Sequence, residues 1–144
     1  LYDVAASTFI QRLAQYIKEN ADQVQPPPWT VTSKTSAHVQ NQPEDPDWWF
    51  TRSASILRKV YMRGPIGIER LRAEYGGRKK FGVRKQHTRR GGGSNVRKIL
   101  QQLEDAKLIE IQKNKGRILT REGRRVLDRL AAQLKSEPEK KQPK

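Results

Sequence analysis

Residues 94–134 read SNVRKILQQLEDAKLIEIQKNKGRILTREGRRVLDRLAAQL, and they contain two helical patterns with a strand pattern between them. Apolar residues three and four apart predict a helix that starts at Gly93-Ser94 and ends near Lys107. Its buried stripe comprises Val96, Ile99, Leu100, Leu103 and Ala106. A second helix is predicted after Thr120, whose hydroxyl suits the cap position. Its inward-facing residues are Val126, Leu127, Leu130, Ala131 and Leu134.

The strand pattern predicts a β-hairpin. Ile109-Glu110-Ile111 and Arg117-Ile118-Leu119 alternate apolar and polar residues on either side of Asn114-Lys115-Gly116, which is typical of a turn between two strands. A helix, a hairpin and a closing helix therefore follow one another in the second half of the chain.

A central helix is predicted from about Pro46 to Arg63. Asp45 serves as its cap, proline suits the first helical position, and Asp47 meets the positive end of the helix dipole. Gly64-Pro65 ends it, because glycine accepts a left-handed turn and proline blocks continuation. Its apolar face comprises Trp49, Phe50, Ser53, Ala54, Ile56, Leu57, Val60 and Tyr61. This face is expected in the core.

A short helix carrying Ile68, Leu71 and Tyr75 follows and is closed by Gly76-Gly77. The order of helix, short helix, helix, two-stranded ribbon and closing helix is that of a winged helix-turn-helix domain. The expected fold class is mainly α: a winged helix-turn-helix-like bundle with an extra N-terminal helix and a small β-hairpin wing.

The extra helix is predicted from about Val4, after a capping Asp3, to about Asn20. The proline-rich stretch after it reads as a long extended connection, which Trp29 pins to the core. We expect one domain over residues 1–135, which includes a basic insertion at 76–93. The charged tail 136–144 has nothing to bury and is expected to be disordered.

Charge is unevenly distributed along the 144 residues, whose formal net charge is +15. Residues 1–50 carry three of the basic and six of the acidic side chains, so the excess of positive charge lies in the rest of the chain. This asymmetry favours a polyanion, and nucleic acid first, as partner. The sequence has no cysteine, its two histidines have no ligand spacing, and no apolar run could span a bilayer, so we expect a soluble, intracellular protein without a metal site.

The basic insertion is the first candidate site. Residues 75–95, YGGRKKFGVRKQHTRRGGGSN, contain no acid. The basic residues are Arg78, Lys79, Lys80, Arg84, Lys85, Arg89 and Arg90. At this density they would neutralise several phosphates, while Phe81 and His87 could stack on unpaired bases. The alternative is a solvated, mobile loop with incidental charge.

The start of the following helix is the second candidate. Ser94 follows three glycines whose N–H groups suit an anion, and Arg97 and Lys98 lie where cations oppose the helix dipole. An anion bound there would explain this reversed polarity. The alternative is that tertiary packing outweighs the unfavourable charges.

Two further basic groups complete the candidates. On the central helix, Trp48, Arg52 and Lys59 project from one side, and a cation–π contact between the first two could form an RNA-facing patch. Equally, the first helix could cover Trp48, and Arg52 could anchor an acid near the chain start. Arg58 points elsewhere and could reach a second contact. The wing tip offers Lys113, Lys115 and Arg117 to a phosphate backbone, or it is an ordinary exposed turn.

The chain resembles the archaeal and eukaryotic family of small-subunit ribosomal proteins numbered nineteen in the e-type nomenclature. The matching segments are DVAASTFIQRLAQYIKEN, PPPWTVTSKT, DWWFTRSASILRKVYMRGPIGIERLRAEYGGRK, GGGSNVRKILQQLEDAKLIE and KGRILTREGRRVLDRLA. Only the tail lies outside them. The doublet Trp48-Trp49 and the phrase GPIGIERLRAEYGG are similar to the archaeal branch.

The resemblance implies a winged-helix-like bundle in the head of the small ribosomal subunit, bound to ribosomal RNA (rRNA) and neighbouring ribosomal proteins. It further implies a role in subunit maturation and translation, a cytoplasmic location, and a monomer outside the ribosome. Trp48, Arg52 and Arg58 would then be positions needed for folding or incorporation, and Arg97 and Lys98 would belong to an RNA-facing helix start.

The leading hypothesis is a structural ribosomal protein without cofactor or small-molecule substrate, whose basic insertion becomes ordered only on RNA. The alternative is a winged-helix DNA-binding transcriptional regulator, since fold does not fix function. A nucleic-acid-modifying enzyme is a third possibility, but no catalytic residue set supports it, and the glycine clusters lack the spacing of a phosphate-binding Walker loop.

Overall fold

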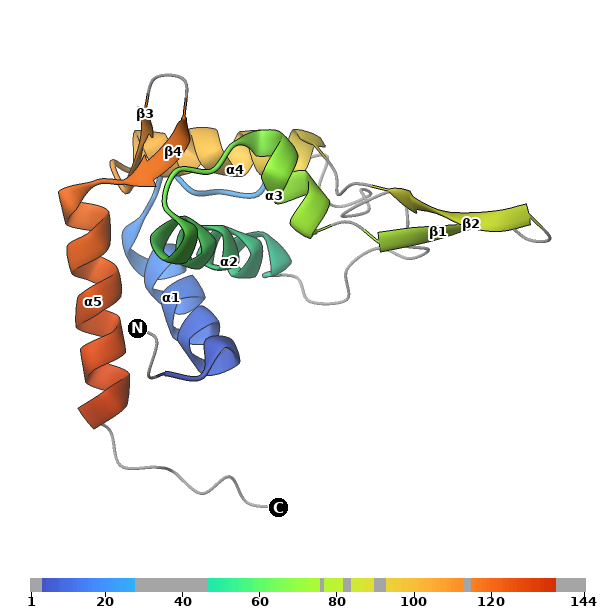
Figure 1. Ribbon diagram of the computed structural model, residues 1–144. Coiled ribbons are helices and arrows are strands. Elements are labelled where there is room, and N and C mark those ends of the chain that lie inside the picture. Colours follow the sequence, from blue (N-terminus) through green and yellow to red (C-terminus); the bar gives the residue numbers. More distant parts are fainter. Residues whose placement is uncertain are drawn as a thin grey trace, which may run out of the picture.

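The computed structural model describes residues 4–27, 47–75, 77–81, 84–89, 93–112 and 115–136, with the backbone alone for 77–81 and 84–89. The elements in chain order are α1 (Ala6–Asn20), α2 (Trp48–Arg63), α3 (Ile68–Glu74), β1 (Gly77–Phe81), β2 (Arg84–Arg89), α4 (Gly93–Asp105), β3 (Ile109–Gln112), β4 (Gly116–Leu119) and α5 (Arg121–Ser136). Figure 1 shows these helices gathered into one bundle, with each pair of strands at its edge. The predicted fold class is confirmed.

Both predicted helix starts lie within two residues of the observed ones, but neither helix has a side-chain cap at the cap residue that the structure describes. Helix α1 begins at Ala6, with Ala5 in the cap position and no capping side chain. Helix α2 begins at Trp48, with Asp47 as its N-cap residue, but the Asp47 carboxylate does not cap the helix. It lies instead 3.0 Å from the Lys18 ammonium of α1, and this ion pair draws it away from the helix end. The predicted roles of Asp3, Asp45 and Pro46, the Trp29 anchor and the tail 137–144 fall outside the described residues.

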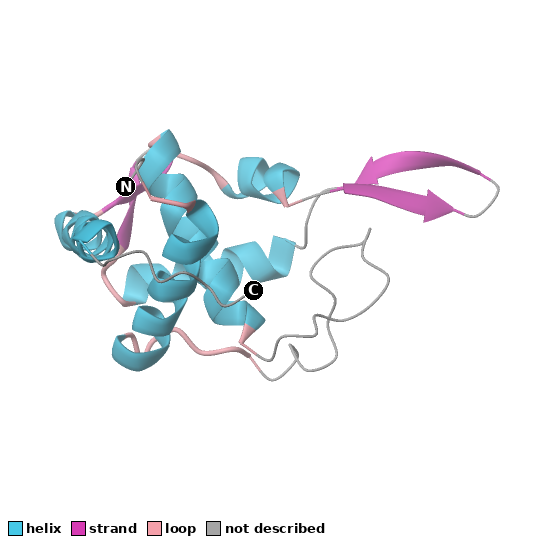
Figure 2. Ribbon diagram, turned by 90° about the horizontal axis from the view of Figure 1, so that it is seen from below, coloured by secondary structure: helices cyan, strands magenta, loops and turns pink. Residues whose placement is uncertain are grey.

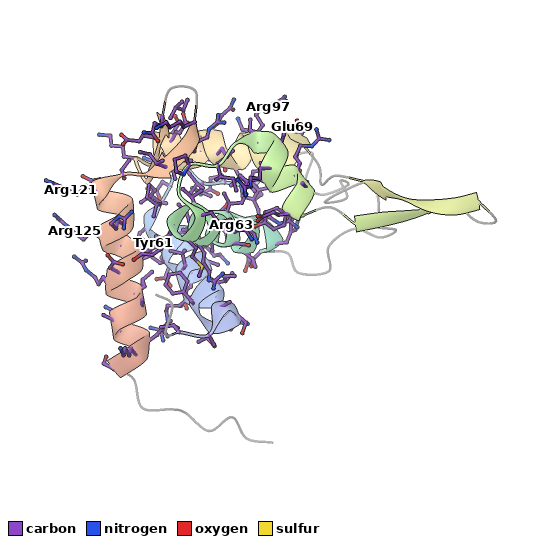
Figure 3. All side chains as sticks on the ribbon, in the orientation of Figure 1. Tyr61, Arg63, Glu69, Arg97, Arg121 and Arg125 are labelled. Carbon is purple, nitrogen blue, oxygen red and sulfur yellow. The ribbon has the colours of Figure 1, made fainter. Side chains whose placement is uncertain are left out.

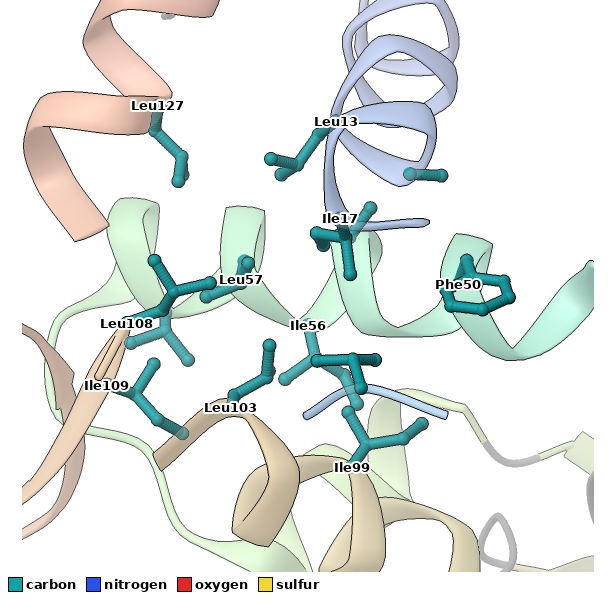
Figure 4. Close-up of a cluster of buried hydrophobic side chains, with 14 of the residues drawn as sticks. Leu13, Ile17, Phe50, Ile56, Leu57, Ile99, Leu103, Leu108, Ile109 and Leu127 are labelled. Carbon is teal, nitrogen blue, oxygen red and sulfur yellow. The ribbon is translucent and has the colours of Figure 1, made fainter. Parts of the chain in front are cut away.

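The core lies where α1, α2 and α4 meet, and α5 closes one side of it (Figure 4). Its largest fully buried side chains are Phe9, Leu13, Ile17, Trp49, Ile56, Leu57, Ile66, Leu71, Ile99, Leu100, Leu103 and Leu127. Most of them come from the apolar stripes that the sequence predicted. At about 1.5–3 kcal/mol for each large apolar side chain removed from water, this cluster is the main source of the stability of the fold.

A chain of buried hydrogen bonds ties three segments together within this core. The Trp49 indole Nε1 donates to Gln102 Oε1 of α4 over 2.8 Å. The Gln102 amide Nε2 in turn donates to the carbonyl of Gln25, after α1, over 2.7 Å. Ser53 donates to the Trp49 carbonyl within α2. Because buried polar groups are costly unless paired, these bonds fix the relative positions of α2, α4 and the segment after α1.

The wing is an antiparallel pair in which Ile109 faces Leu119 and Gln112 faces Gly116. Strand β4 also pairs with Ile66, between α2 and α3, through two backbone hydrogen bonds with Arg117. The wing is therefore anchored to the helices. The predicted Thr120 cap is confirmed, because its Oγ1 accepts a hydrogen bond from the Gly123 N–H over 3.0 Å.

The basic insertion contains two strands that the sequence analysis did not predict. Gly77 of β1 faces Arg89 of β2, Lys79 faces His87, and the register shifts between Lys79 and Phe81. Figures 1 and 2 show this hairpin extending away from the helical bundle, between the end of α3 and the start of α4. Whether RNA is needed to order it remains a prediction.

Helix α3 has only seven residues, and its end is held against α2 by charged and aromatic groups. The Arg52 guanidinium lies 4.0 Å from the centre of the Tyr75 ring, and the Tyr75 hydroxyl shares a hydrogen bond with Ser55. Glu74 forms ion pairs with Lys59 and Arg63 of α2. These contacts place the end of α3, and with it the base of the hairpin.

Burial shifts the ionisation of both partners in the cation–π contact. It lowers the pKa of Arg52, and the Tyr75 ring opposes this shift only in part. Burial also raises the pKa of Tyr75 above 10.0, while the bond to Ser55 and the charge of Arg52 pull it back. The neutral form of Tyr75 is therefore favoured by the folded state.

We expect Gly116→Ala to destabilise the wing. Gly116 has φ +107°, and a Cβ there would lie 2.6 Å from the backbone carbonyl of Ile66. Backbone strain of this kind costs about 1–3 kcal/mol. The control is Gly67→Ala, where a Cβ has no neighbour within 4 Å. Urea unfolding checks this prediction, and equal stabilities of the two variants would contradict it.

The raised pKa of Tyr75 predicts a stability difference that changes at alkaline pH. Below pH 10.0 Tyr75 is neutral in both states and its stabilisation is complete. Above pH 10.0 the tyrosine of the unfolded state ionises first, so this stabilisation is lost progressively as the pH rises toward the pKa of the folded state. The free energy of unfolding of the wild type, minus that of Tyr75→Phe, should be constant below pH 10.0 and then fall by at most about 1.4 kcal/mol per pH unit.

Urea titrations of both proteins between neutral pH and pH 11 measure this difference, since the other tyrosines and the lysines affect both proteins alike. Parallel curves over the whole range would show that Tyr75 is not responsible.

Candidate nucleic-acid interface

The start of α4 combines a buried anchor with exposed cations. Asn95 and Val96 are buried in the bundle, whereas Ser94, Arg97 and Lys98 are exposed. The first turn contains no acid. Positive side chains beside the positive end of a helix dipole repel it, so this end of the molecule is arranged to receive negative charge. The three residues that the sequence singled out here lie together (Arg97 is labelled in Figure 3).

Arg72 of α3 extends this basic cluster, and the sequence analysis missed it. A Cβ added at Gly93 would come within 3.2 Å of the Arg72 Nε, so the guanidinium lies against the first residue of α4. Glu69 accepts a hydrogen bond from Arg72 over 3.2 Å and orients it. Arg72 is distant from Arg97 in sequence, and only the packing of α3 on α4 brings the two helices together. We call Arg72, Ser94, Arg97 and Lys98 the α4 surface.

The hairpin brings most of the basic insertion to the neighbourhood of this surface. Arg78, Lys79 and Lys80 lie on β1, and Arg84, Lys85, His87 and Arg89 lie on β2. Their backbone positions are described, but their side chains and all of Arg90 lie outside the described part. Their nucleic-acid contacts therefore stay predictions. The pairing does place basic residues along both strands of a projecting ribbon (Figure 1).

On α2, neither of the two roles that the sequence left open for Arg52, a contact with the Trp48 ring or an ion pair with an acid near the chain start, is seen in the described part of the chain. Arg52 lies over Tyr75, because the end of α3 supplies a closer ring. Trp48 is half-buried and packs edge-on against Trp49, with 5.5 Å between ring centres. Lys59 is paired with Glu74. These α2 residues hold the fold together, and their contact with RNA stays a prediction.

The remaining candidates differ in exposure. The Arg58 Nε is buried and has no hydrogen-bond partner within the part of the chain that the structure describes. At the wing, Lys115 is exposed, and Lys113 lies outside the described residues. Arg117 is largely buried and its Nε lies 3.2 Å from Glu104 of α4, so it fastens the wing to the bundle.

A row of arginines on α5 was also missed. Arg121, Arg124, Arg125 and Arg129 are exposed and line a shallow hollow together with Asp128. Figure 3 shows Arg121 and Arg125 pointing away from the bundle at its left edge, whereas Arg97 projects from its top. The spacing of these arginines is visible in REGRRVLDR, but the same segment also carries apolar residues of the stripe that predicts the closing helix.

Within the described ranges, no group of three or more histidine, aspartate or glutamate side chains is placed to hold a metal ion. The described helices include none that is long and apolar enough to cross a membrane.

Comparisons with known proteins agree with the resemblance seen in the sequence. The family described as ribosomal protein S19e matches residues 1–137. The small ribosomal subunit protein eS19 of Aeropyrum pernix is 45% identical over 98% of this chain and 93% of its own length. The eS19 protein of Argopecten irradians is 41% identical over 96% of each chain. That of Haloarcula marismortui is 39% identical over 95% of this chain and 92% of its own.

Archaeal and animal proteins match at similar identity, so the archaeal leaning of two sequence motifs stays a prediction. The match covers α1 to α5, which includes the bundle, both hairpins and the α4 surface. The family inferred from the sequence is confirmed: the chain belongs to the ribosomal protein S19e family.

Proposed function

We propose that this protein is a structural constituent of the cytoplasmic small ribosomal subunit and that it binds rRNA through the α4 surface and the adjoining hairpin. The names of its relatives support the first part, since each is a small ribosomal subunit protein. The contacts below support the second. In this proposal the protein contributes charge and shape, and it needs neither cofactor nor small-molecule substrate.

The observation that carries the proposal is the reversed charge pattern of α4. Arg97 and Lys98 are exposed near its N-terminal end, while Glu104 and Asp105 lie near its C-terminal end. Both arrangements weaken an isolated helix by a few tenths of a kcal/mol or more per charge. A phosphate group at the N-terminal end reverses the sign of the first effect, because it meets the positive end of the dipole and two cations at once.

The hairpin supports RNA rather than a DNA major groove as the partner. In a compact helix-turn-helix reader a short turn joins the two helices, and the second enters the groove. Here β1 and β2 stand between α3 and α4 and project beside the N-terminal end of α4 (Figure 2). Such a ribbon would keep the start of α4 from entering a DNA major groove as a recognition helix does. Folded RNA offers bent backbones and loops, which a projecting basic ribbon fits.

Several finer points follow as parts of the same proposal. The protein lies in the head of the subunit, contacts neighbouring ribosomal proteins there, supports subunit maturation and translation, and is monomeric when free. The partly buried Arg58 offers one point for such a contact, because its Nε has no hydrogen-bond partner in the described part of the chain.

We expect Arg97→Glu/Lys98→Glu to fold normally and to fail in RNA binding. Both side chains are exposed, and acids near a helix N-terminus stabilise it by about 0.3–1 kcal/mol each, so the thermal midpoint should stay or rise. Loss of two phosphate contacts should weaken binding to small-subunit rRNA on the order of 10- to 100-fold. Filter binding measures this affinity, and reconstitution of small subunits measures incorporation.

A control lies just beyond the C-terminal end of the same helix. Lys107→Glu changes the net charge as much as Arg97→Glu alone, but Lys107 is exposed and follows the end of α4 at Asp105, away from the α4 surface. It should bind and incorporate like the wild type. Equal losses of rRNA affinity for Arg97→Glu and Lys107→Glu would show that only the overall charge matters. If circular dichroism showed that the double variant is unfolded, Arg97 and Lys98 would be needed for the fold rather than for RNA binding.

A further inference from the structure

Helix α5 presents a row of arginines that the fold does not use. Arg121, Arg125 and Arg129 are spaced four residues apart, so they lie one above another on one face of the helix. Among the described residues, the side chains of these three arginines have no ion pair or hydrogen bond, and all three are exposed. Like charges at this spacing repel one another and weaken the helix, which indicates that something outside the protein compensates them.

The acid in the same hollow is already occupied. Asp128 Oδ1 accepts a hydrogen bond from the Tyr61 hydroxyl of α2 over 2.7 Å. The Arg124 guanidinium lies 5.1 Å from the centre of the same Tyr61 ring. Tyr61 therefore holds Asp128 toward α2 and contacts the Arg124 guanidinium through its ring. Arg121 and Arg125 point away from the bundle into solvent (Figure 3).

The type of cation points to phosphate. Every basic residue of α5 before Lys135 is arginine, although lysine is common elsewhere in the chain. Arginine binds phosphate oxygens through two parallel N–H donors and is favoured in nucleic-acid recognition, whereas solubility alone does not require it. The row follows a straight helix and carries no aromatic side chain between its arginines, which suits a regular backbone rather than unpaired bases.

We infer that the α5 row is a second RNA-binding surface, which holds the phosphate backbone of a double-helical RNA segment while the α4 surface holds another. Arg97 of the α4 surface and Arg121 and Arg125 of α5 project from different sides of the bundle, so the protein would join two separate RNA segments (Figure 3). This inference rests on the proposed function and goes beyond it, because one RNA contact is sufficient for that function.

A bridging measurement tests the inference with the full chain. Two short RNA duplexes, one with a donor and one with an acceptor dye, are mixed with the protein in excess RNA. The wild type should bring both together and give energy transfer. Arg121→Gln/Arg125→Gln should still bind one duplex but lose the transfer. A second measurement isolates α5 by starting from the Arg97→Glu/Lys98→Glu variant, in which the α4 surface is blocked. In this background, the slope of log affinity against log salt concentration should become shallower by about 0.9 for each α5 arginine removed.

Two controls keep the result interpretable. Lys18→Gln removes one cation on α1, outside both surfaces, and should leave transfer unchanged. Arg125→Gln/Arg129→Gln repeats the loss with a second pair. Since the arginines repel one another and are exposed, both α5 variants should keep the circular dichroism spectrum and thermal midpoint of the wild type, or melt higher.

The outcomes separate this inference from the proposed function. Transfer that persists in both α5 variants, or a wild type that binds one duplex only, overturns the second surface and leaves the α4 surface intact. No binding of any RNA by the wild type overturns both. If the α5 variants keep bridging duplexes but lose affinity for polyglutamate, the row binds an acidic protein and not RNA, which also overturns the inference.

Discussion

The packing of both faces of α2 determines where every other element lies. One face buries Trp49, Ile56 and Leu57 against α1 and α4. The other face presents Arg52 and Lys59 to the end of α3. A seven-residue helix such as α3 is not stable alone, so it depends on these contacts, on the burial of Leu71 and on its packing against α4. Because the hairpin and the start of α4 follow α3, the α4 surface depends on the core helix that precedes it.

The basic side chains that the structure describes include cations that serve the fold and cations that face outward. Lys59, Arg63 and Arg117 are paired with carboxylates of neighbouring elements, where the opposite charge is close. Arg97 and Arg121 are exposed and have no such partner in the described part of the chain. A net charge of +15 destabilises a compact state by self-repulsion, and the proposed binding of a polyanion would offset this cost.

The sequence predicted elements well wherever periodicity was strong. The apolar stripes of α2, α4 and α5, the wing and the Thr120 cap follow from spacing and from one hydroxyl. Helix starts were less predictable, because the Asp47 carboxylate could cap α2 or pair with Lys18, and only the distance between α1 and α2 decides.

The candidate site was predictable in part, for a related reason. Arg97 and Lys98 stood out because helix polarity is a local property that a sequence displays. Arg72 did not, because its place beside Gly93 results from the packing of α3 on α4. The partner of Arg52 could not be read from the sequence. Trp48 is the aromatic residue four positions away on the same helix, but the guanidinium contacts the ring of Tyr75, which only the fold brings close. Charge alone cannot distinguish a cation that binds a partner from one that holds a helix.

The insertion changes what a winged-helix scaffold can do. In A-form RNA the major groove is too deep and narrow for side chains to read, so a helix cannot act there as it does on DNA. In the proposed function, a protein that keeps the scaffold contacts RNA through phosphates, from helix ends and projecting strands. The start of α4, the β1–β2 ribbon and the arginines of α5 are the candidates for such contacts. The helical bundle would then act as a spacer, whose apolar core sets the distances between these surfaces.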